Sequence, residues 1–291
     1  MQSTGARRDI KARALVAAAG GFQANIDWMK EIWGPPAANF HVRGTPCNRG
    51  TLLKMLMERG VKTVGDPAQC HAVAVDARSP KFDGGIATRI DSILFGIVVN
   101  RHARRFYDEG EDFWPKRYAV WGRLIAQQPD QIAYAIFDSK VSGRFVPSAY
   151  RHIVADSLPE LAAKLALDPE ELQRTIADFN AATAPGSPDY TTLDSCRTAG
   201  LELPKSHWAT RIDSPPYFAY PMRPGITFTY LGARVNQEAR VLLGSGPPVT
   251  NVFAAGEIMA GNVLGQGYVA GVGVTIGSVF GQVAGAGAAR V

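Results

Sequence analysis

The sequence has few cysteines and lacks the short motifs that would assign a function at once. Cys47, Cys70 and Cys196 are an odd number at wide spacing, without a CxxC pair or a Cys/His cluster. Neither a disulfide framework nor a structural zinc site is therefore indicated. No P-loop, HExxH or GxSxG pattern occurs, so nothing points to a P-loop nucleotidase, a zincin-type protease or an α/β hydrolase.

A large excess of charge of one sign is also missing. The chain has 31 Lys and Arg against 26 Asp and Glu, a net charge of +5. This excess is too small to indicate a nucleic-acid-binding protein, but it suits a small acidic substrate. The basic N-terminal residues Arg7, Arg8, Lys11 and Arg13 precede only a short, Gly-rich apolar stretch. That pattern does not favour a secretory signal peptide, and we expect a cytoplasmic protein.

The first part of the chain has the pattern of an α/β protein. With 291 residues, 46% of them hydrophobic, the chain can bury a substantial core. Residues 12–18 form an apolar run that predicts a buried strand, Gly20-Gly21 ends it, and a helical pattern follows over residues 28–33. A short amphipathic helix is predicted over residues 51–59. Strand, glycine turn and helix in this order are typical of an α/β fold.

The middle of the chain, residues 69–208, holds most of the charge and predicts a separate α+β module. Ser157 and Asp168 are each followed by a proline and then by Glu within the first turn, so each is predicted to cap a scaffold helix. Acidic residues gather here beside basic ones, which predicts a salt-bridged surface rather than a metal site. The acids are Asp108, Glu109, Glu111 and Asp112, and the bases are Arg104, Arg105, Lys116 and Arg117.

From Asn251 onward the composition changes, since Glu257 and Arg290 are the only charged residues. Residues 269–289 carry no charge and have a glycine at every fourth position, at Gly273, Gly277, Gly281 and Gly285. A membrane helix that pairs through a small face has this pattern, but the stretch is poor in Leu and Ile and has no basic flank. We expect no membrane insertion. Each helical glycine costs about 1 kcal/mol relative to alanine, so the stripe predicts a close approach by a sheet or a ligand.

A strand and a loop precede the glycine stripe. Residues 252–255 predict a strand that ends in Gly256-Glu257, and residues 265–271 predict a flexible loop. The loop leads into the helix, so unpaired N–H groups would face whatever lies over the loop. Residues 265–270 fit GxGxxA, but neither a strand nor an acidic residue about 20 positions on follows them. We therefore do not interpret them as a dinucleotide motif.

Several motifs occur along nearly the whole chain: Ala18-Ala-Gly20-Gly21-Phe22 with Asn25, Gln69-Cys-His71, Ile97-Val-Val-Asn100 with Arg105-Phe106, and Ala255-Gly256-Glu257. In this order they resemble the flavoprotein family of fumarate reductases, succinate dehydrogenases and related FAD enzymes. Residues 71–76, 106–114 and 256–264 are similar in particular to the tricarballylate dehydrogenase branch of that family.

The resemblance implies an α/β fold with an α+β insertion, in which a doubly wound FAD-binding domain is interrupted by a capping domain. Residues 1–67 and 214–291 would form the remainder of the FAD-binding domain and residues 68–213 the cap, with the substrate between cap and flavin. Members of the family begin with a strand, a GxGxxG turn and a helix that hold the FAD diphosphate. The sequence starts after these elements, so we expect the chain alone to bind FAD poorly.

The resemblance also implies which residues contact FAD. The glycine turn after the first strand would let the backbone approach the adenosine half, and the acid after the last strand would accept hydrogen bonds from the ribityl hydroxyls. The last helix would direct its first N–H groups at the flavin C2 carbonyl and stabilise the reduced ring. In that order the residues are Gly20, Gly21 and Phe22, then Gly256 and Glu257, then Gly271, Gly273 and Val274. Glu257 has the alternative of a solvated residue at a strand end.

On the substrate side the resemblance makes His71 a substrate-binding histidine and, with Arg144 and Tyr268, a candidate catalytic residue. Arg144 lies near, though out of register with, the family's proton-donating arginine, in whose place Ser142 falls. Thr229, a candidate substrate-binding residue, stands in the segment where fumarate reductases have paired histidines, and Tyr268 stands where they have an arginine. The alternatives are a structural role for His71, a surface role for Arg144 and ring packing for Tyr268.

Counting back from Asn100, Arg89 and Ser92 fall where the family has the Glu and Arg of a proton relay. A base thus replaces an acid, which argues against a fumarate reductase. We expect Arg89 to clamp an additional substrate carboxylate by bidentate hydrogen bonds. Tyr268 is then the candidate acid, base or orienting group at the flavin.

Together these residues predict an FAD-dependent dehydrogenase that oxidises a tricarballylate-like polycarboxylate by hydride transfer to flavin N5. Its partners would be the small carboxylate and an electron acceptor that the sequence does not identify, with no nucleic acid. One alternative is a ketosteroid dehydrogenase-like enzyme, which an apolar cap pocket would favour. The other is a flavin-free binding or regulatory protein of the same family.

Overall fold

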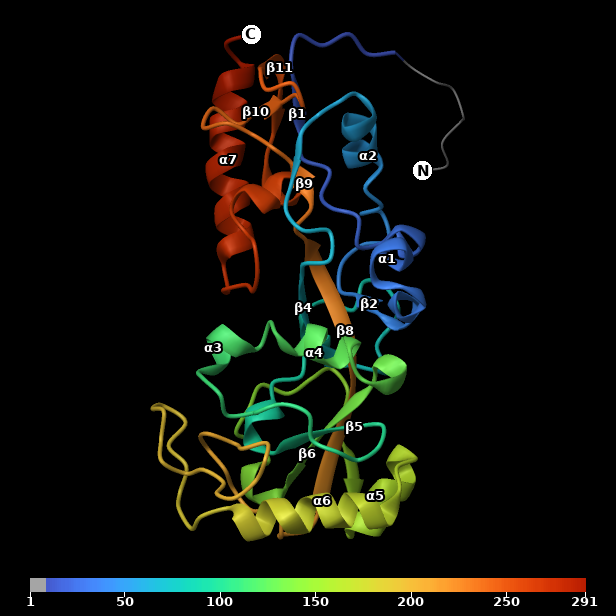
Figure 1. The fold of residues 1–291 in the computed structure, drawn as a ribbon, viewed down its shortest axis with the longest axis vertical. Helices are drawn as coiled ribbons and strands as arrows, with labels where there is room; N and C mark the ends of the chain where they lie inside the picture. The colour runs from blue at the N-terminus through green and yellow to red at the C-terminus, as the bar shows by residue number, and fades with distance from the viewer. Residues whose placement is uncertain (1–8) are drawn as a thin grey trace.

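Residues 9–291 are described by the computed structural model, and they form an elongated molecule with two structured ends (Figure 1). One end contains the C-terminal helix α7 (Val272–Ala288) beside a small sheet. The other contains α5 (Leu158–Leu165) and α6 (Pro169–Ala182) below a larger sheet. The mixture of helices and sheets confirms the predicted α/β fold class.

The small sheet joins segments from opposite ends of the sequence. Its order is β1 (Leu15–Ala17), β11 (Pro248–Ala254) and β10 (Arg240–Leu242), and β1 runs parallel to β11. The strands predicted over residues 12–18 and 252–255 are thereby confirmed. Helix α7 packs on β1 and β11, so an early strand and the C-terminal helix share one end of the molecule (Figure 1).

Helix α7 confirms the helix predicted in the glycine-rich tail. Across residues 9–291, no helix has both the length and the apolar character that crossing a bilayer requires. Arg7 and Arg8, which entered the signal-peptide argument, lie outside the described residues.

The larger sheet is built around one long strand, β8 (Tyr217–Thr229). The first half of β8 pairs antiparallel with β6 (Ala133–Asp138), and the second half pairs antiparallel with β4 (Cys70–Asp76). Strand β8 therefore runs from one end of the molecule toward the other (Figure 1). Residues on both sides of the predicted limit at 213/214 contribute to this one sheet, and the domain limits stay a prediction.

Short strands complete the larger sheet or, for β3 (Thr63–Val64) and β9 (Gly232–Ala233), form a separate two-stranded sheet, and short helices surround them. The remaining strands are β2 (His41–Val42), β5 (Ile97–Asn100) and β7 (Ile153–Ala155). The remaining helices are α1 (Ile26–Trp33), α2 (Thr51–Glu58), α3 (Trp114–Arg117) and α4 (Trp121–Ala126).

The predicted helix caps are present. The Ser157 hydroxyl accepts from the Glu160 N–H at 3.3 Å, and the Asp168 carboxylate accepts from the Glu170 and Glu171 N–H groups at 2.9 and 3.0 Å. Such caps satisfy N–H groups that the first helical turn leaves unpaired. Helix α6 buries the predicted apolar face, made of Leu172, Ile176 and Phe179.

The acidic cluster is paired with bases, as predicted, but part of it is not at the surface. Glu109 is buried, bonds Arg105 at 2.5 Å and accepts from the Val98 N–H at 2.8 Å. Glu111 pairs with Arg117 at 2.7 Å. The buried Glu109 pair thus ties its loop to strand β5, which short-range charge patterns cannot predict.

Candidate functional site

An open groove of about 510 Å³ lies between α7 and the end of β1. Most of its lining is small: Val16, Ala18, Ala19, Gly20, Asn48, Ala255, Gly256, Glu257, Gly277 and Gly281. A Cβ added to Gly277 or Gly281 would meet no protein atom within 4 Å. These two glycines therefore keep space in the groove free, whereas protein packing does not require them.

Among the described residues that line the groove, Glu257 is the one acid, and hydrogen bonds fix it against β8. Its Oε1 accepts from the Thr229 N–H at 2.9 Å, and its Oε2 accepts from the Gln23 side-chain amide at 3.3 Å. Burial raises the pKa of Glu257, which these hydrogen bonds partly offset. The alternative of a solvated strand-end residue is therefore wrong.

The glycine turn after β1 supports this carboxylate from behind. A Cβ on Gly21 would lie 2.0 Å from Thr229 Oγ1 and 2.3 Å from Glu257 Oε1, so only glycine fits. The Phe22 N–H donates to Thr229 Oγ1 at 3.2 Å, while its buried ring stacks on Trp28. Gly20 lines the groove directly, whereas Phe22 and Thr229 belong to its supporting wall.

His71 lies at the start of β4, opposite Phe228 of β8. Its ring stacks on Tyr268 with centroids 3.7 Å apart, and Tyr118 meets its edge at 5.7 Å. Within residues 9–291, the buried Nδ1 atom has no hydrogen-bond partner. Burial, with the nearby charges of Arg43 and Arg89, lowers the pKa of His71 to about 3. His71 is therefore neutral at neutral pH.

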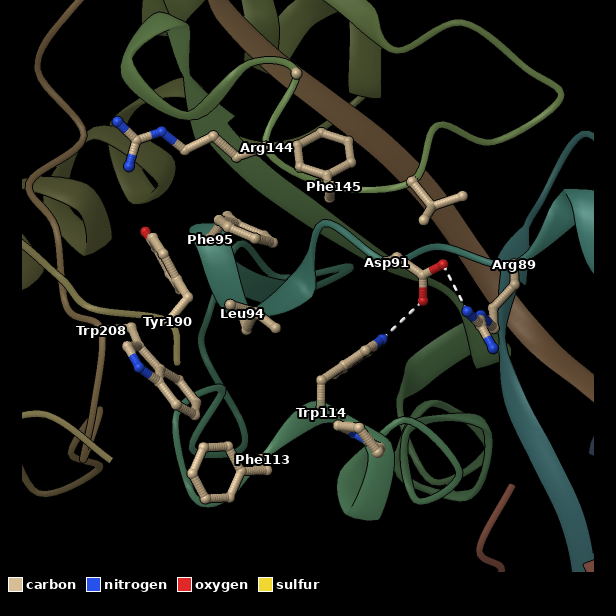
Figure 2. Close-up of a pocket in the computed structure, with 13 residues that line it drawn as sticks. Arg89, Asp91, Leu94, Phe95, Phe113, Trp114, Arg144, Phe145, Tyr190 and Trp208 are labelled. Atoms are coloured by element: carbon tan, nitrogen blue, oxygen red, sulfur yellow. Dashed lines mark hydrogen bonds and ion pairs between the residues drawn. The ribbon is translucent and has the colours of Figure 1, made fainter. Parts of the chain in front are cut away.

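Arg89 stands beside His71, but an acid already holds it. Its guanidinium donates to Asp91 at 2.8 Å and lies 5.1 Å from the centre of the Tyr118 ring. The second Asp91 oxygen accepts from the Trp114 indole at 2.7 Å (Figure 2). The charge predicted to clamp a substrate carboxylate is thus matched by Asp91 in this structure.

Arg43, which sequence reasoning missed, belongs to the same group. It follows β2 and is half-buried, and its pKa is lowered by burial and by the charge of Arg89. The signal in the sequence was an arginine between a short strand and Gly44. The role of Arg43 depends on the side chains around it, and these come from segments that are far away in the sequence.

A second pocket, of about 480 Å³, extends from Arg89 and Asp91 into the lower part of the molecule. Aromatic rings form most of its wall, and Arg144 lies at the opposite side from Arg89 (Figure 2). The aromatic residues are Phe95, Phe113, Trp114, Phe145, Tyr190 and Trp208. Arg144 is exposed, and in the described part of the chain no hydrogen bond, ion pair or ring contact joins it to His71 or Tyr268.

Tyr268 connects the His71 site with the N-terminus of α7. Its Oη accepts from the Gly273 N–H at 2.9 Å, so the N–H predicted to face a flavin carbonyl already has an acceptor. Gly271 adopts φ = 95° just before the helix, and the Val274 side chain is 75% exposed. The loop therefore holds Tyr268 between His71 and the helix end.

The fold and the groove together define an α/β protein of the flavin-binding type. The chain belongs to the FAD binding domain family, which matches residues 1–274, and FAD is the cofactor of that family. The chain is 26% identical to urocanate reductase of Eggerthella lenta, over 99% of this chain and 46% of that protein. It is 29% identical to a probable fumarate reductase of Shewanella frigidimarina, over 97% of this chain and 45% of that protein.

A solved structure has the same fold. The 3-ketosteroid Δ1-dehydrogenase of Sterolibacterium denitrificans gives a TM-score of 0.70 at 20% identity, covering 96% of this chain and 54% of that one. The chain spans about half the length of these relatives.

The groove fits part of FAD. Its free volume beside Gly277 and Gly281 accepts a narrow chain, and the Glu257 carboxylate is an acceptor suited to hydroxyl groups. The Glu257 carboxylate is held in place, because the Thr229 N–H and the Gln23 side chain donate hydrogen bonds to it. The lining therefore suits the chemistry of a ribityl or ribose segment.

Proposed function

We propose that this chain forms the flavin-facing and substrate-binding part of an FAD-dependent dehydrogenase for a tricarballylate-like polycarboxylate. The observation that carries the proposal is that the Glu257 groove and the His71 site adjoin on β8. Thr229 bonds Glu257, and the next residue back, Phe228, pairs with His71. A cofactor in the groove would therefore meet a substrate beside His71.

The groove residues would hold the cofactor. Gly20, Gly256 and Glu257 would contact the ribose and ribityl part, and Gly277 with Gly281 would let it pass close to α7. Bound FAD would supply the hydride acceptor for the oxidation. The Gly273 and Val274 N–H groups remain the proposed contacts to the flavin ring, which for Gly273 requires Tyr268 to move.

The His71 site would bind the substrate and take up its proton. Neutral His71 donates or accepts a hydrogen bond without adding charge, and Arg89 would share its guanidinium between Asp91 and a carboxylate. We assign the proton step to Tyr268 rather than Arg144, because Tyr268 stacks on His71. Removing a hydride from one carbon and a proton from its neighbour leaves a carbon–carbon double bond.

The test is an anaerobic mixture of the purified chain, FAD and tricarballylate. We expect loss of the oxidised-flavin absorbance with tricarballylate and no loss with the chain omitted. A chain that binds FAD yet gives no bleaching with any polycarboxylate would contradict the substrate class. A chain that binds no FAD at all would favour a flavin-free binding role.

A cyclic, largely apolar substrate is the second candidate. The aromatic pocket next to Arg89 and Asp91 favours it, since flat rings pack well against Phe, Tyr and Trp. An enzyme of this kind would bleach the flavin with a 3-ketosteroid in place of tricarballylate. The same anaerobic experiment with both compounds therefore separates the two candidates.

A further inference from the structure

We propose that Arg43 binds a substrate carboxylate, and that it is the main anion-binding side chain of the His71 site. The inference rests on the proposed function, because it concerns the substrate of that same site. It changes the expected division of roles: Arg89 was predicted to hold the extra carboxylate, but it already shares its guanidinium with Asp91.

The backbone holds Arg43 firmly at the edge of the site. Strand β2 pairs with β8, and the Arg43 N–H donates to the Ile226 carbonyl at 2.9 Å. The Arg43 carbonyl accepts from the Gly85 N–H at 2.9 Å. Bonds on both sides of the residue fix where its side chain starts, and side-chain bonds to Gly85 and Thr227 hold its guanidinium.

The guanidinium has neutral partners only. Its Nη1 donates to Thr227 Oγ1 at 3.1 Å, and its Nε donates to the Gly85 carbonyl at 3.3 Å. A guanidinium has five N–H donors, and these bonds use two of them. No carboxylate of residues 9–291 forms an ion pair with Arg43. A bound carboxylate would supply the missing counter-charge.

The local charge balance points to the same ligand. Arg43 and Arg89 carry two positive charges, Asp91 carries one negative charge, and His71 is neutral. The site is therefore short of one negative charge in a partly buried setting, where an uncompensated charge is costly. A substrate carboxylate restores the balance, whereas an uncharged ketone does not.

A bulge in β8 directs Thr227 toward Arg43 and ties this site to the groove. The pairing with β4 shifts between His71 and Ala72, which leaves Thr227 as the extra residue on β8. The Gln23 side-chain amide donates to the Thr227 carbonyl at 3.2 Å and to Glu257 at 3.3 Å. Arg43 therefore lies at a fixed place relative to the cofactor groove.

The experiment compares tricarballylate binding by calorimetry to the full chain, with and without added FAD. Arg43→Gln removes the charge, and Arg49→Gln removes an equal charge from an exposed residue of the same loop. We expect Arg43→Gln to weaken binding about 10- to 100-fold, the loss typical of a charge-assisted hydrogen-bonded pair. Arg49→Gln should bind as the wild type does.

Arg43→Lys keeps the charge and loses the planar fork, so we expect an intermediate affinity. It also carries the test if Arg43→Gln does not fold. Wild-type affinity in either folded Arg43 variant, or equal losses in the Arg43 and Arg49 variants, would overturn the proposal. If an Arg43 variant keeps wild-type affinity, flavin bleaching by tricarballylate should continue, and the proposed function then survives without the Arg43 proposal. If the wild type binds no tricarballylate, the Arg43 proposal and the polycarboxylate substrate fall together.

Discussion

The groove beside α7 and the site around His71 adjoin the same strand but have opposite chemistry. The groove has small side chains and one carboxylate, Glu257, whereas the His71 site has two guanidiniums and a set of aromatic rings. Two threonines of β8 separate them, since Thr229 bonds Glu257 and Thr227 bonds Arg43. Two threonines of one strand thus hold an acceptor for hydroxyl groups, Glu257, and a donor for carboxylates, Arg43.

The largest effect should come from protonating the His71 site. The pKa of His71 is about 3 in the fold against 6.5 when unfolded, so the unfolded chain binds more protons between these values. His71 therefore contributes a loss of stability as the pH falls from 6.5 toward 3, of about 3 kcal/mol at pH 4. Denaturant unfolding at pH 7 and pH 4 measures this loss.

His71→Gln isolates the contribution of this histidine, because it keeps a hydrogen-bonding side chain but cannot take up the proton. The drop in stability between pH 7 and pH 4 should shrink by most of that amount. An unchanged drop would assign it to other groups, such as His41, whose pKa is lowered to about 4.

Substitution in the glycine turn after β1 should destabilise the fold nearly as much as protonation of His71 does. Gly21→Ala would place a methyl group 2.0 Å from Thr229 Oγ1, and overpacking of this kind costs about 1–3 kcal/mol. We expect a loss at the upper end, seen as a lower midpoint in thermal unfolding, together with weaker FAD binding. A wild-type midpoint would show that the wall behind Glu257 is loose.

Glu257→Gln should separate binding from folding. The amide oxygen can still accept from the Thr229 N–H, and loss of a buried carboxylate with a raised pKa removes little stability. FAD binding should weaken about tenfold, because hydrogen bonds to a charged acceptor are the stronger ones. Fluorescence titration of FAD, with exposed Glu238→Gln as the control, tests this.

The smallest expected effect is a gain in the free energy of unfolding. Gly277→Ala adds a methyl group that meets no protein atom and lowers the entropy cost of the helix, so α7 should gain about 0.5–1 kcal/mol. Thermal unfolding without FAD measures it. A loss of stability would mean that the glycine stripe serves protein packing.

The sequence predicted the elements whose signals are local. Caps at Ser157 and Asp168 and short apolar periods placed the helices well. Strand β8 gave no such signal, because Pro221, Pro224 and Gly225 are unfavourable in a central strand, yet they pair with β6 and β4. Long-range pairing overrides local preference there.

The sequence pointed to residues of the groove more clearly than to the charge pairing around His71. Glu257 was visible as the lone acid of an apolar tail. The roles of Arg43 and Arg89 depend on which of them has an acidic partner. Asp91 pairs with Arg89, and this pairing depends on side-chain geometry. Charge pairing between segments far apart in the sequence cannot be read from composition.

The most direct test of the account is FAD titration of the Gly277→Leu/Gly281→Leu double variant, followed by flavin fluorescence. The wild type should show weak but saturable quenching. The variant should keep its thermal midpoint and its tricarballylate binding while losing the quenching, because the leucines would fill the groove and leave the His71 site intact. Wild-type affinity for FAD in the folded double variant would contradict the assignment of the groove to the cofactor.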